Sequence, residues 1–261
     1  MLECNHESVV SAVAARLQRY NQAKVCAEIC ECDGMYARGL PGADSQYFSV
    51  GRSAIDLIAR AMIAGRRPKV GSVLDLPCGG GRVTRHLVAF LPDAAIYVAE
   101  LNKRNEEFVT RTFGVSPISA PPDFGIPPTR SFDLVFVGSL LTHLPADRFA
   151  AALKWFISAL APDGLLVATT HGRQADDWER TILHHIDPRL WSKVERAWKE
   201  HGFGYVETER NTAGSYGYNL TAPSWVLNLV ENDPSCRVLG FEEAAWNDHQ
   251  DAIILQRRPS A

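Results

Sequence analysis

The sequence predicts an α/β protein built on a doubly wound, mostly parallel sheet. Between residues 70 and 170, short apolar runs rich in β-branched residues alternate with segments whose apolar residues recur every three or four positions. A glycine-rich turn follows the first of these runs. Repeated strand-then-helix units are typical of parallel strands joined by right-handed crossovers, so helices should cover both faces of the sheet.

Each element follows from this periodicity and from the turn residues between segments. Seven strands are expected, at residues 70–76, 95–99, 116–120, 132–138, 165–170, 237–243 and 252–256. Helices are expected at residues 6–32, from Gly51 or Arg52 to residue 65, at residues 83–91, 103–113, 149–160, 177–186 and 190–201, and from Thr221 and Pro223 onward. The loop 244–251 is short enough to join the last two strands as an antiparallel hairpin.

The composition excludes several classes of protein. With 46% hydrophobic residues, 22% charged residues and a formal charge of −3, the chain is neither a coiled coil nor collagen nor disordered. No apolar stretch approaches the ~18 residues of a membrane-spanning helix, and the polar start is no secretory signal. We therefore expect a cytoplasmic protein without a membrane span. The slightly acidic charge does not favour nucleic acid as a partner.

The six cysteines are expected to be thiols rather than bridges, because the cytosol is reducing. Cys26, Cys30 and Cys32 lie close together, with Cys4 and His6 upstream. This spacing lacks the second ligand pair of a structural zinc site, so we expect no metal.

The main clue to function is the segment from Val73 to Arg82, where a buried strand runs into three glycines and then a helix. Glycines let the backbone approach a ligand closely, and the helix N-terminus offers free N–H groups. Thr84 stands where a dinucleotide-binding motif needs its third glycine. Glu100 ends the second strand about 20 residues further on, where a carboxylate can bind ribose hydroxyls. The pattern indicates a nucleoside cofactor other than a nicotinamide dinucleotide.

These segments resemble class I S-adenosylmethionine-dependent methyltransferases. Val-Leu-Asp-Leu-Pro-Cys-Gly-Gly-Gly-Arg at 73–82 is similar to motif I, and Tyr-Val-Ala-Glu-Leu at 97–101 matches the acidic end of strand two. Residues 132–145 resemble the fourth-strand motif. Residues 160–167 resemble the turn before strand five, with Asp163 replacing a glycine. Phe-Gly-Tyr at 203–205, Tyr-Gly-Tyr at 216–218 and Trp-Asn-Asp-His-Gln-Asp at 246–251 resemble, more weakly, a bacterial subgroup found near polysaccharide- and glycan-modifying genes.

The resemblance implies a Rossmann-like sheet of seven strands whose last strand runs antiparallel. It also implies S-adenosylmethionine as cofactor and S-adenosylhomocysteine as product. Glu100 would accept the ribose hydroxyls, Leu101 would pack on the adenine, and Asp75 would orient the turn or meet the cofactor's amino group. Arg52 could pair with the cofactor carboxylate or be a solvated surface arginine. The other cofactor-binding candidates line the turn or the crevice near the transferring methyl: Pro77, Cys78, Gly79, Gly81, Arg82, Gly138 and Ser139.

Candidates for acceptor chemistry lie where strands end. A hydroxyl acceptor needs a base for its proton, and histidine suits neutral pH. His143 and His171 follow strands four and five. His249 with Asp251 could form an oriented base, because an antiparallel last strand begins at the rim where the parallel strands end. Each of these residues could instead be structural. The candidates for substrate contact, or for simple packing, are Tyr216, Tyr218 and Trp246.

The chain is expected to be a single methyltransferase domain over residues 1–261. Within it we distinguish a helical cap (1–65), a cofactor-binding core (66–171), an insertion or lid (172–220), and a terminal helix with its hairpin (221–261). The cap and the insertion are expected to close over the crevice and to set acceptor choice.

The sequence thus predicts methyl transfer from S-adenosylmethionine to a small-molecule acceptor, with a saccharide or other hydroxyl as the candidate group. Two alternatives stay open: an NAD(P)-dependent oxidoreductase, and an S-adenosylmethionine-binding partner protein without catalysis. A nucleic-acid methyltransferase is disfavoured, because no Asn/Asp-Pro-Pro-Tyr/Phe-like motif follows strand four. The acceptor, the methylated atom and the oligomeric state are left open by the sequence.

Overall fold

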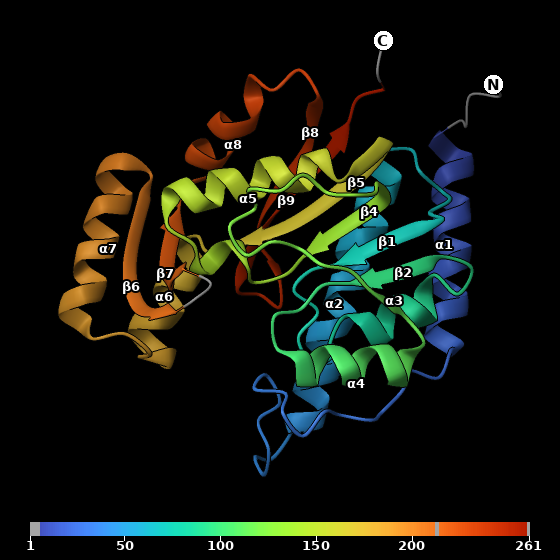
Figure 1. Cartoon of the computed structure of the whole chain (residues 1–261), viewed down its shortest axis with the longest axis horizontal. Helices are drawn as coiled ribbons and strands as arrows, with labels where there is room; N and C mark the ends of the chain where they lie inside the picture. The colour runs from blue at the N-terminus through green and yellow to red at the C-terminus, as the bar shows by residue number, and fades with distance from the viewer. Residues whose placement is uncertain (1–5, 212–213, 260–261) are drawn as a thin grey trace.

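The computed structural model describes residues 6–211 and 214–259, and it is organised around a seven-stranded sheet (Figure 1). The strand order is β3-β2-β1-β4-β5-β9-β8. The first five strands run parallel, whereas β9 is antiparallel to β5 and β8 is antiparallel to β9. The predicted fold class is confirmed. The strands are β1 Ser72–Asp75, β2 Ala95–Val98, β3 Ser116–Pro117, β4 Phe132–Val137, β5 Leu160–Thr170, β8 Cys236–Trp246 and β9 Gln250–Arg257.

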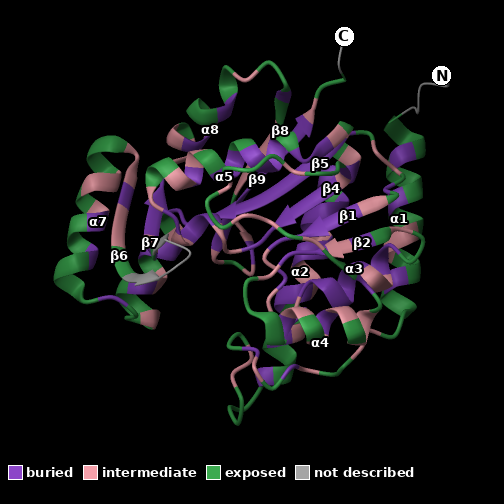
Figure 2. Cartoon of the chain, viewed as in Figure 1, coloured by how far each residue is buried: buried purple, intermediate pink, exposed green. Residues whose placement is uncertain are grey.

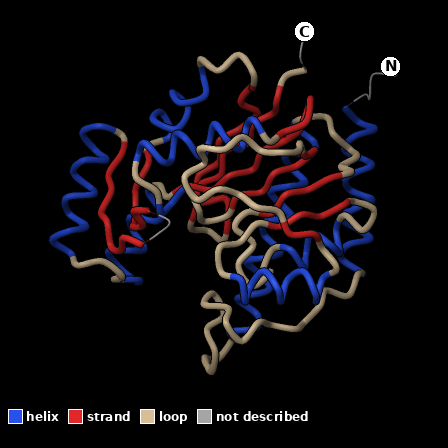
Figure 3. The backbone as a smooth tube through the Cα atoms, in the orientation of Figure 1, coloured by secondary structure: helices blue, strands red, loops and turns tan. Residues whose placement is uncertain are grey.

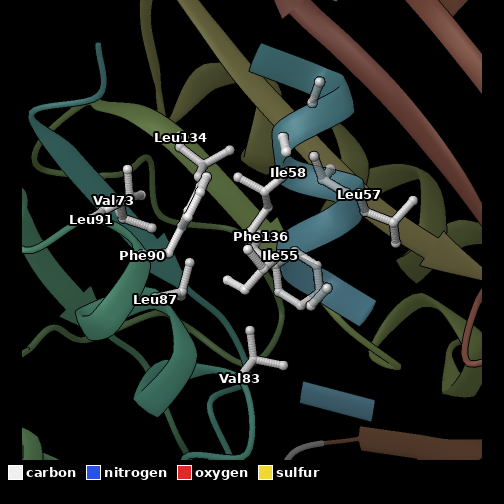
Figure 4. Packing of buried hydrophobic residues seen from close by; sticks show 14 of the residues in the cluster. Ile55, Leu57, Ile58, Val73, Val83, Leu87, Phe90, Leu91, Leu134 and Phe136 are labelled. Carbon is white, nitrogen blue, oxygen red and sulfur yellow. The ribbon is translucent and has the colours of Figure 1, made fainter. Parts of the chain in front are cut away.

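Helices cover both faces of the sheet, because successive strand residues point to opposite sides. On one face Val73 and Leu134 pack against the first four helices, and Figure 4 shows Ile58 and Leu87 in this core. On the other face Leu74 and the residues that alternate with the first set pack against α5 and α8. Figure 2 shows the sheet as buried between them. The helices are α1 His6–Gln22, α2 Ala43–Ala64, α3 Thr84–Phe90, α4 Lys103–Phe113, α5 Ala146–Ser158 and α8 Pro223–Glu231.

The insertion forms a separate lobe beside the main sheet (Figure 1). Its glycine- and tyrosine-rich stretch folds into an antiparallel hairpin, β6 Phe203–Asn211 and β7 Gly214–Thr221. α6 Arg173–Trp178 precedes it, and α7 Pro188–His201 packs on the hairpin around Trp191, Val194 and Leu220. The helix expected at 177–186 is instead the end of α6 continued by a π-helical turn, Glu179–Leu183. The lobe therefore has an apolar core of its own.

The first helix is shorter than the apolar spacing predicted, ending at Gln22 rather than at residue 32. Residues 23–42, which we call the strap, form neither helix nor strand and join α1 to α2 (Figure 3). Buried Arg85 explains the difference, because its Nη1 donates to the carbonyl oxygens of Cys26 and Glu28 at 2.9 and 2.8 Å. This tertiary contact holds carbonyl groups that a continued helix would use for its own ladder.

The second helix begins at Ala43, not at Gly51 or Arg52 as the sequence predicted. Gly51 lies inside α2 because the helix crosses close to Arg82 and α3 there. A Cβ atom at Gly51 would lie 2.2 Å from the Arg82 carbonyl oxygen and 2.4 Å from the His86 ring. The glycine thus permits close helix packing and does not mark a helix start.

Substituting this glycine should be costly. We expect Gly51→Ala to lower the free energy of unfolding by about 3 kcal/mol, the upper range for overpacking, because the added methyl group meets backbone. Gly34→Ala in the strap is the control, since a Cβ atom there would have no described neighbour within 4 Å; its effect should stay within about 0.5 kcal/mol. Urea denaturation measures both values, and equal effects at the two positions would contradict this account of the packing.

Two strand boundaries also differ from expectation. The third strand is confined to Ser116–Pro117, and Pro117 has no N–H to extend a ladder. In the terminal hairpin the strands extend to Trp246 and from Gln250, so the loop comprises residues 247–249 rather than 244–251. In the described part of the chain, no helix is both long and apolar enough to cross a membrane.

The cysteines depart from the expectation in one place. Cys30 and Cys32, both in the strap, are joined by a disulfide, whereas Cys26, Cys78 and Cys236 are free thiols. A single residue separates the two bonded cysteines in the sequence. The spacing of the cysteines did not predict this disulfide. Cys4 lies outside the described residues.

Candidate cofactor and acceptor site

A pocket of ≈ 200 Å³ lies beside the carboxyl ends of β1 and β4, where the first glycine turn and the lobe hairpin meet. It brings together ten of the residues singled out in the sequence: Asp75, Pro77, Cys78, Gly79, Arg82, Gly138, Ser139, His143, Tyr216 and Trp246. These residues come from the first turn, the end of β4, the hairpin and the terminal strands, so the topology assembles them from distant parts of the chain.

The glycine turn owes its shape to residues with positive φ. Gly79 and Gly81 have φ values of 51° and 81°, which side chains rarely allow. A Cβ atom at Gly81 would also lie 2.4 Å from the Phe113 ring, so this glycine lets α4 pack against the turn rather than facing the pocket. The Gly79 N–H donates to Glu100 Oε2 at 2.9 Å. The carboxylate that ends β2 therefore anchors the glycine turn.

Asp75 lies at the end of β1 and is almost fully buried. Its Oδ2 accepts a hydrogen bond from Thr84 Oγ1 at 2.6 Å, which ties the strand to the first residue of α3. Thr84 thus has a structural use at the position where a dinucleotide motif carries glycine. Burial, with a contribution from Glu100, raises the pKa of Asp75 to about 7.

The raised pKa predicts a pH dependence of stability. An unfolded aspartate titrates near 3.8, so between 3.8 and about 7 the folded chain keeps a proton that the unfolded chain loses. The contribution of Asp75 to stability is fully present below the unfolded pKa and is lost as the pH rises through about 7. We expect Asp75→Asn to gain stability relative to the wild type across this window, measured by urea denaturation at several pH values. Asp93→Asn, at an exposed position, is the control; parallel curves for wild type and Asp75→Asn would contradict the assignment.

Trp246 forms one wall of the pocket but is mostly core. Its indole Nε1 donates to the Val50 carbonyl oxygen of α2 at 3.0 Å, and its ring meets Phe136 edge-on. The Arg82 guanidinium lies 5.5 Å from the centre of the indole. A Cβ atom at Gly138 would approach the indole to 2.7 Å, so the absence of a side chain there makes room for it. The role of Trp246 in substrate contact remains a prediction.

Four cofactor candidates do not line the pocket: Gly81 and Glu100, which shape the glycine turn, and Leu101 and Arg52. Leu101 is 63% exposed on the surface after β2. Arg52 lies on α2, where its guanidinium is 3.6 Å from Asp56 and 4.9 Å from the centre of the Tyr20 ring. The structure therefore gives Arg52 a local ion-pair and ring partner, and a contact with the cofactor carboxylate remains a prediction.

The three histidines expected at strand ends lie side by side. The ring centres of His143 and His171 are 6.3 Å apart, and those of His171 and His249 are 5.2 Å apart. Of the three, only His143 lines the pocket. Its Nδ1 lies 2.7 Å from the Gly217 carbonyl oxygen, which can only accept, so Nδ1 carries the proton and Nε2 of the neutral ring is free to accept one. Burial lowers the pKa of His143, so the neutral form prevails near pH 7.

His143 is held between the two tyrosines of the hairpin. The Tyr216 ring stacks on it at 4.4 Å between centres, and the Tyr218 ring meets it edge-on at 5.0 Å. Tyr216 lines the pocket and is 38% exposed. β7 therefore supplies both the carbonyl that orients the histidine and an aromatic face at the pocket mouth.

His171 and His249 are placed for packing more than for pocket contact. His171 is buried, which lowers its pKa well below the usual value. His249 stacks on Trp178 of α6 at 4.7 Å, and burial lowers its pKa to about 4. Asp251 Oδ1 accepts from the Ala244 N–H at 2.8 Å, and the described part of the chain has no hydrogen bond between Asp251 and His249. Catalytic roles for these three residues remain predictions.

Sequence reasoning missed the contribution of the strap. Asp33 and Met35 line the pocket, and Asp33 lies against the glycine turn, since a Cβ atom at Gly80 would be 2.4 Å from Asp33 Oδ2. Asp33 is buried; its Oδ2 accepts from the Tyr47 hydroxyl at 2.5 Å and its Oδ1 accepts from the Met35 N–H at 2.8 Å. Asp33 and Asp75 thus place two carboxyl groups at this pocket, which Arg82 also lines. No local pattern marks Asp33, because its place depends on the fold of the strap. Within the described ranges, no group of three or more His, Cys, Asp or Glu side chains could hold a metal ion.

A parallel sheet with a glycine turn, an acidic residue just after β2 that binds this turn, and a pocket beside the turn are typical of an α/β enzyme that binds a nucleoside cofactor. The chain belongs to the family described as "Methyltransferase domain", whose model matches residues 45–208. It is thus a class I S-adenosylmethionine-dependent methyltransferase, as the motifs predicted. The alternative of an NAD(P)-dependent oxidoreductase is set aside.

Solved structures share the fold at low sequence identity. The N-methyltransferase NodS from Bradyrhizobium japonicum WM9, in complex with S-adenosyl-L-homocysteine, is 14% identical with a TM-score of 0.51, over 95% of this chain and 99% of that one. The amino pentose methyltransferase CalS10 from Micromonospora echinaspora, with S-adenosylmethionine bound, is 16% identical with a TM-score of 0.53, over 84% and 93%. An O-methyltransferase family protein from Burkholderia thailandensis is 13% identical with a TM-score of 0.51, over 98% and 71%. No curated protein matches this chain in sequence.

Proposed function

We propose that this methyltransferase acts on a hydroxyl group of a small molecule, with a saccharide as the acceptor class to test first. The observation that carries the proposal is the state of His143: it lines the pocket, and its bond to the Gly217 carbonyl leaves Nε2 as an unprotonated acceptor. A hydroxyl acceptor must lose a proton during methylation, and a positioned neutral histidine can take it.

The residues around the pocket fit S-adenosylmethionine. When bound, it supplies a methyl group on a positively charged sulfur. Asp33 offers a carboxylate to the cationic part of the cofactor, and Asp75 offers a buried carboxyl group that can hydrogen-bond to it. The positive φ of Gly79 keeps the turn open for close approach. We propose that Glu100 receives the ribose hydroxyls in addition to the Gly79 N–H that it already binds.

In the proposed reaction the acceptor O–H bond breaks as its proton moves to His143 Nε2. An oxygen lone pair forms the new O–CH₃ bond, and the C–S bond electrons stay on sulfur as S-adenosylhomocysteine leaves. The chain contributes alignment, a base and partial exclusion of water, which are the usual contributions of a protein to an in-line displacement. Tyr216 offers a ring face at the pocket mouth on which a sugar or an aromatic ring could stack.

Methyl transfer tests the proposal directly. The protein is incubated with S-adenosylmethionine carrying a deuterated methyl group and with a panel of saccharides and phenols, each paired with the corresponding amine. Mass spectrometry and NMR of the products locate the label. The panel includes amino sugars because similar folds include an amino pentose methyltransferase. A labelled methyl ether supports the proposal, whereas label on nitrogen, or binding of S-adenosylhomocysteine with no labelled product, refutes it.

A further inference from the structure

Ser139, the second residue after β4, has a backbone conformation that calls for an explanation. Its φ is 59°, in the left-handed region that non-glycine residues rarely occupy. Such strain persists where the surroundings impose it, and it gathers at functional sites. Ser139 lines the pocket together with His143, so the strained residue shares a pocket with the proposed base.

Three hydrogen bonds close a ring around Ser139. Its backbone N–H donates to Thr169 Oγ1 of β5 at 2.9 Å, and Thr169 Oγ1 donates to Gln250 Oε1 of β9 at 2.6 Å. Gln250 Nε2 then donates to Ser139 Oγ at 2.9 Å. Thr142 Oγ1 also donates to the Ser139 carbonyl oxygen at 2.7 Å. Three segments that are distant in the sequence thus fix one residue.

The direction of this ring follows from burial. Thr169 is fully buried, and its hydroxyl already accepts from the Ser139 N–H, so its own proton needs an acceptor. The carbonyl oxygen of Gln250 is that acceptor, which turns the amide nitrogen of Gln250 toward Ser139. Reversing the amide would leave the Thr169 proton unpaired among the described residues. The Ser139 hydroxyl is therefore an acceptor within the ring, and its own proton remains to be donated.

We propose that Ser139 donates a hydrogen bond to the acceptor oxygen, and that Gln250 and Thr169 are positioning residues that fix the direction of this bond. The inference rests on the proposed function. The oxygen of an acceptor hydroxyl has two lone pairs and one proton. It can receive the Ser139 hydrogen bond on one lone pair, give its proton to His143, and attack the methyl group with the other lone pair.

The same arrangement selects against nitrogen. A neutral amine has a single lone pair, so it cannot accept from Ser139 and attack the methyl group at the same time. An amine that accepted the serine hydrogen bond would be held in an unreactive pose. The ring thus favours hydroxyl over amine acceptors, in addition to supplying a contact that orients the oxygen beside His143.

Gln250→Glu tests the direction of the bond. An ionised carboxylate accepts from both Thr169 and Ser139, so the serine proton turns away from the acceptor. We expect kcat to fall by about ten- to a hundredfold, with binding of S-adenosylhomocysteine changed less than about twofold in calorimetry. A protonated glutamic acid reproduces the donor and acceptor of glutamine. The kcat of this variant relative to wild type should therefore recover as the pH is lowered, which a merely structural role would not produce.

The control is Gln256→Glu, the same change in a buried glutamine of the same strand. Gln256 Nε2 donates to the Gly65 and Asp163 carbonyl oxygens, away from the pocket. This variant can lose stability, but kcat measured below its unfolding transition should not show the pH recovery.

Ser139→Gly removes the hydroxyl while tolerating the positive φ, and should also lower kcat about ten- to a hundredfold. Thr169→Ser should keep more activity than Thr169→Val, because only serine preserves the ring.

The assay uses the hydroxyl compound that wild type methylates in the panel of saccharides and phenols. If wild type forms a methyl ether and both Gln250→Glu and Ser139→Gly match its kcat at every pH, the inference is overturned and the proposed function stands. If wild type methylates nitrogen or forms no product although it binds S-adenosylhomocysteine, the proposed function fails, and the inference fails with it. Reduced kcat in both variants, with pH recovery only in Gln250→Glu, supports the inference.

Discussion

Replacing His143 with asparagine is expected to lower kcat by about a hundred- to ten-thousandfold, the range for loss of a general base. The asparagine amide can still donate to the Gly217 carbonyl, which the Nδ1–H of His143 does in the wild type, but it offers no basic nitrogen in place of Nε2. Affinity for S-adenosylhomocysteine, measured by calorimetry, should change less than about twofold. A large fall in kcat with unchanged affinity indicates a base, whereas a residue that only shapes the pocket would change the affinity as well.

The pH profile gives an independent reading of the same residue. Burial lowers the pKa of His143 below the ordinary 6.5. The wild-type rate should therefore stay level around neutral pH and fall only when the pH drops below this lowered pKa. The fall should be absent from the residual activity of His143→Asn. His6→Asn, at an exposed position of α1, controls for loss of a histidine. An asparagine variant with wild-type kcat would remove His143 from the mechanism.

Replacing Glu100 with alanine is expected to weaken binding of S-adenosylhomocysteine by about 1–3 kcal/mol, or roughly five- to 150-fold in Kd. Two effects add. The proposed contact of the carboxylate with the ribose hydroxyls is lost, and the turn loses the bond from Gly79 N–H to Oε2. The other oxygen, Oε1, accepts from the Asn102 N–H at 2.8 Å, and the alanine variant loses this hydrogen bond as well.

Two further variants isolate the contribution of the carboxylate. Glu107→Ala removes an exposed glutamate from α4 and should leave Kd unchanged within about twofold. Glu100→Gln keeps one carbonyl oxygen that can bind a backbone N–H, so it should retain the turn better than alanine while still losing affinity. Unchanged affinity in Glu100→Ala would place the nucleoside elsewhere in the fold.

Much of the fold could be predicted from the sequence because its core obeys local rules. Between residues 70 and 170 each apolar run is a strand or a helix face, and most strands pair with a sequence neighbour, although β4 pairs with β1 rather than with β3. The departures arise where a distant partner overrides the local pattern. The carbonyl groups after Gln22 bind Arg85 instead of continuing α1, and Gly51 serves helix packing inside α2. Neither partner can be recognised from the spacing alone.

The candidate site was predictable in part for the same reason. Parallel strands end at one rim, so residues after β1, β4 and β5 were expected to meet, and His143, His171 and His249 do lie together. Which histidine faces the pocket depends on β7 and α6, whose positions no local pattern gives. The roles of Asp33 and Gln250 were not predicted, because each takes its place through bonds to residues in other segments of the chain.

The position of the β6–β7 hairpin affects which tautomer the His143 ring adopts. The carbonyl that decides which nitrogen of His143 bears the proton belongs to Gly217, in the same hairpin that carries the pocket residue Tyr216. With the hairpin displaced, nothing in that segment would bias the imidazole toward one tautomer. If His143 is the base that we propose, the position of this hairpin therefore also sets whether Nε2 can accept the proton of the acceptor.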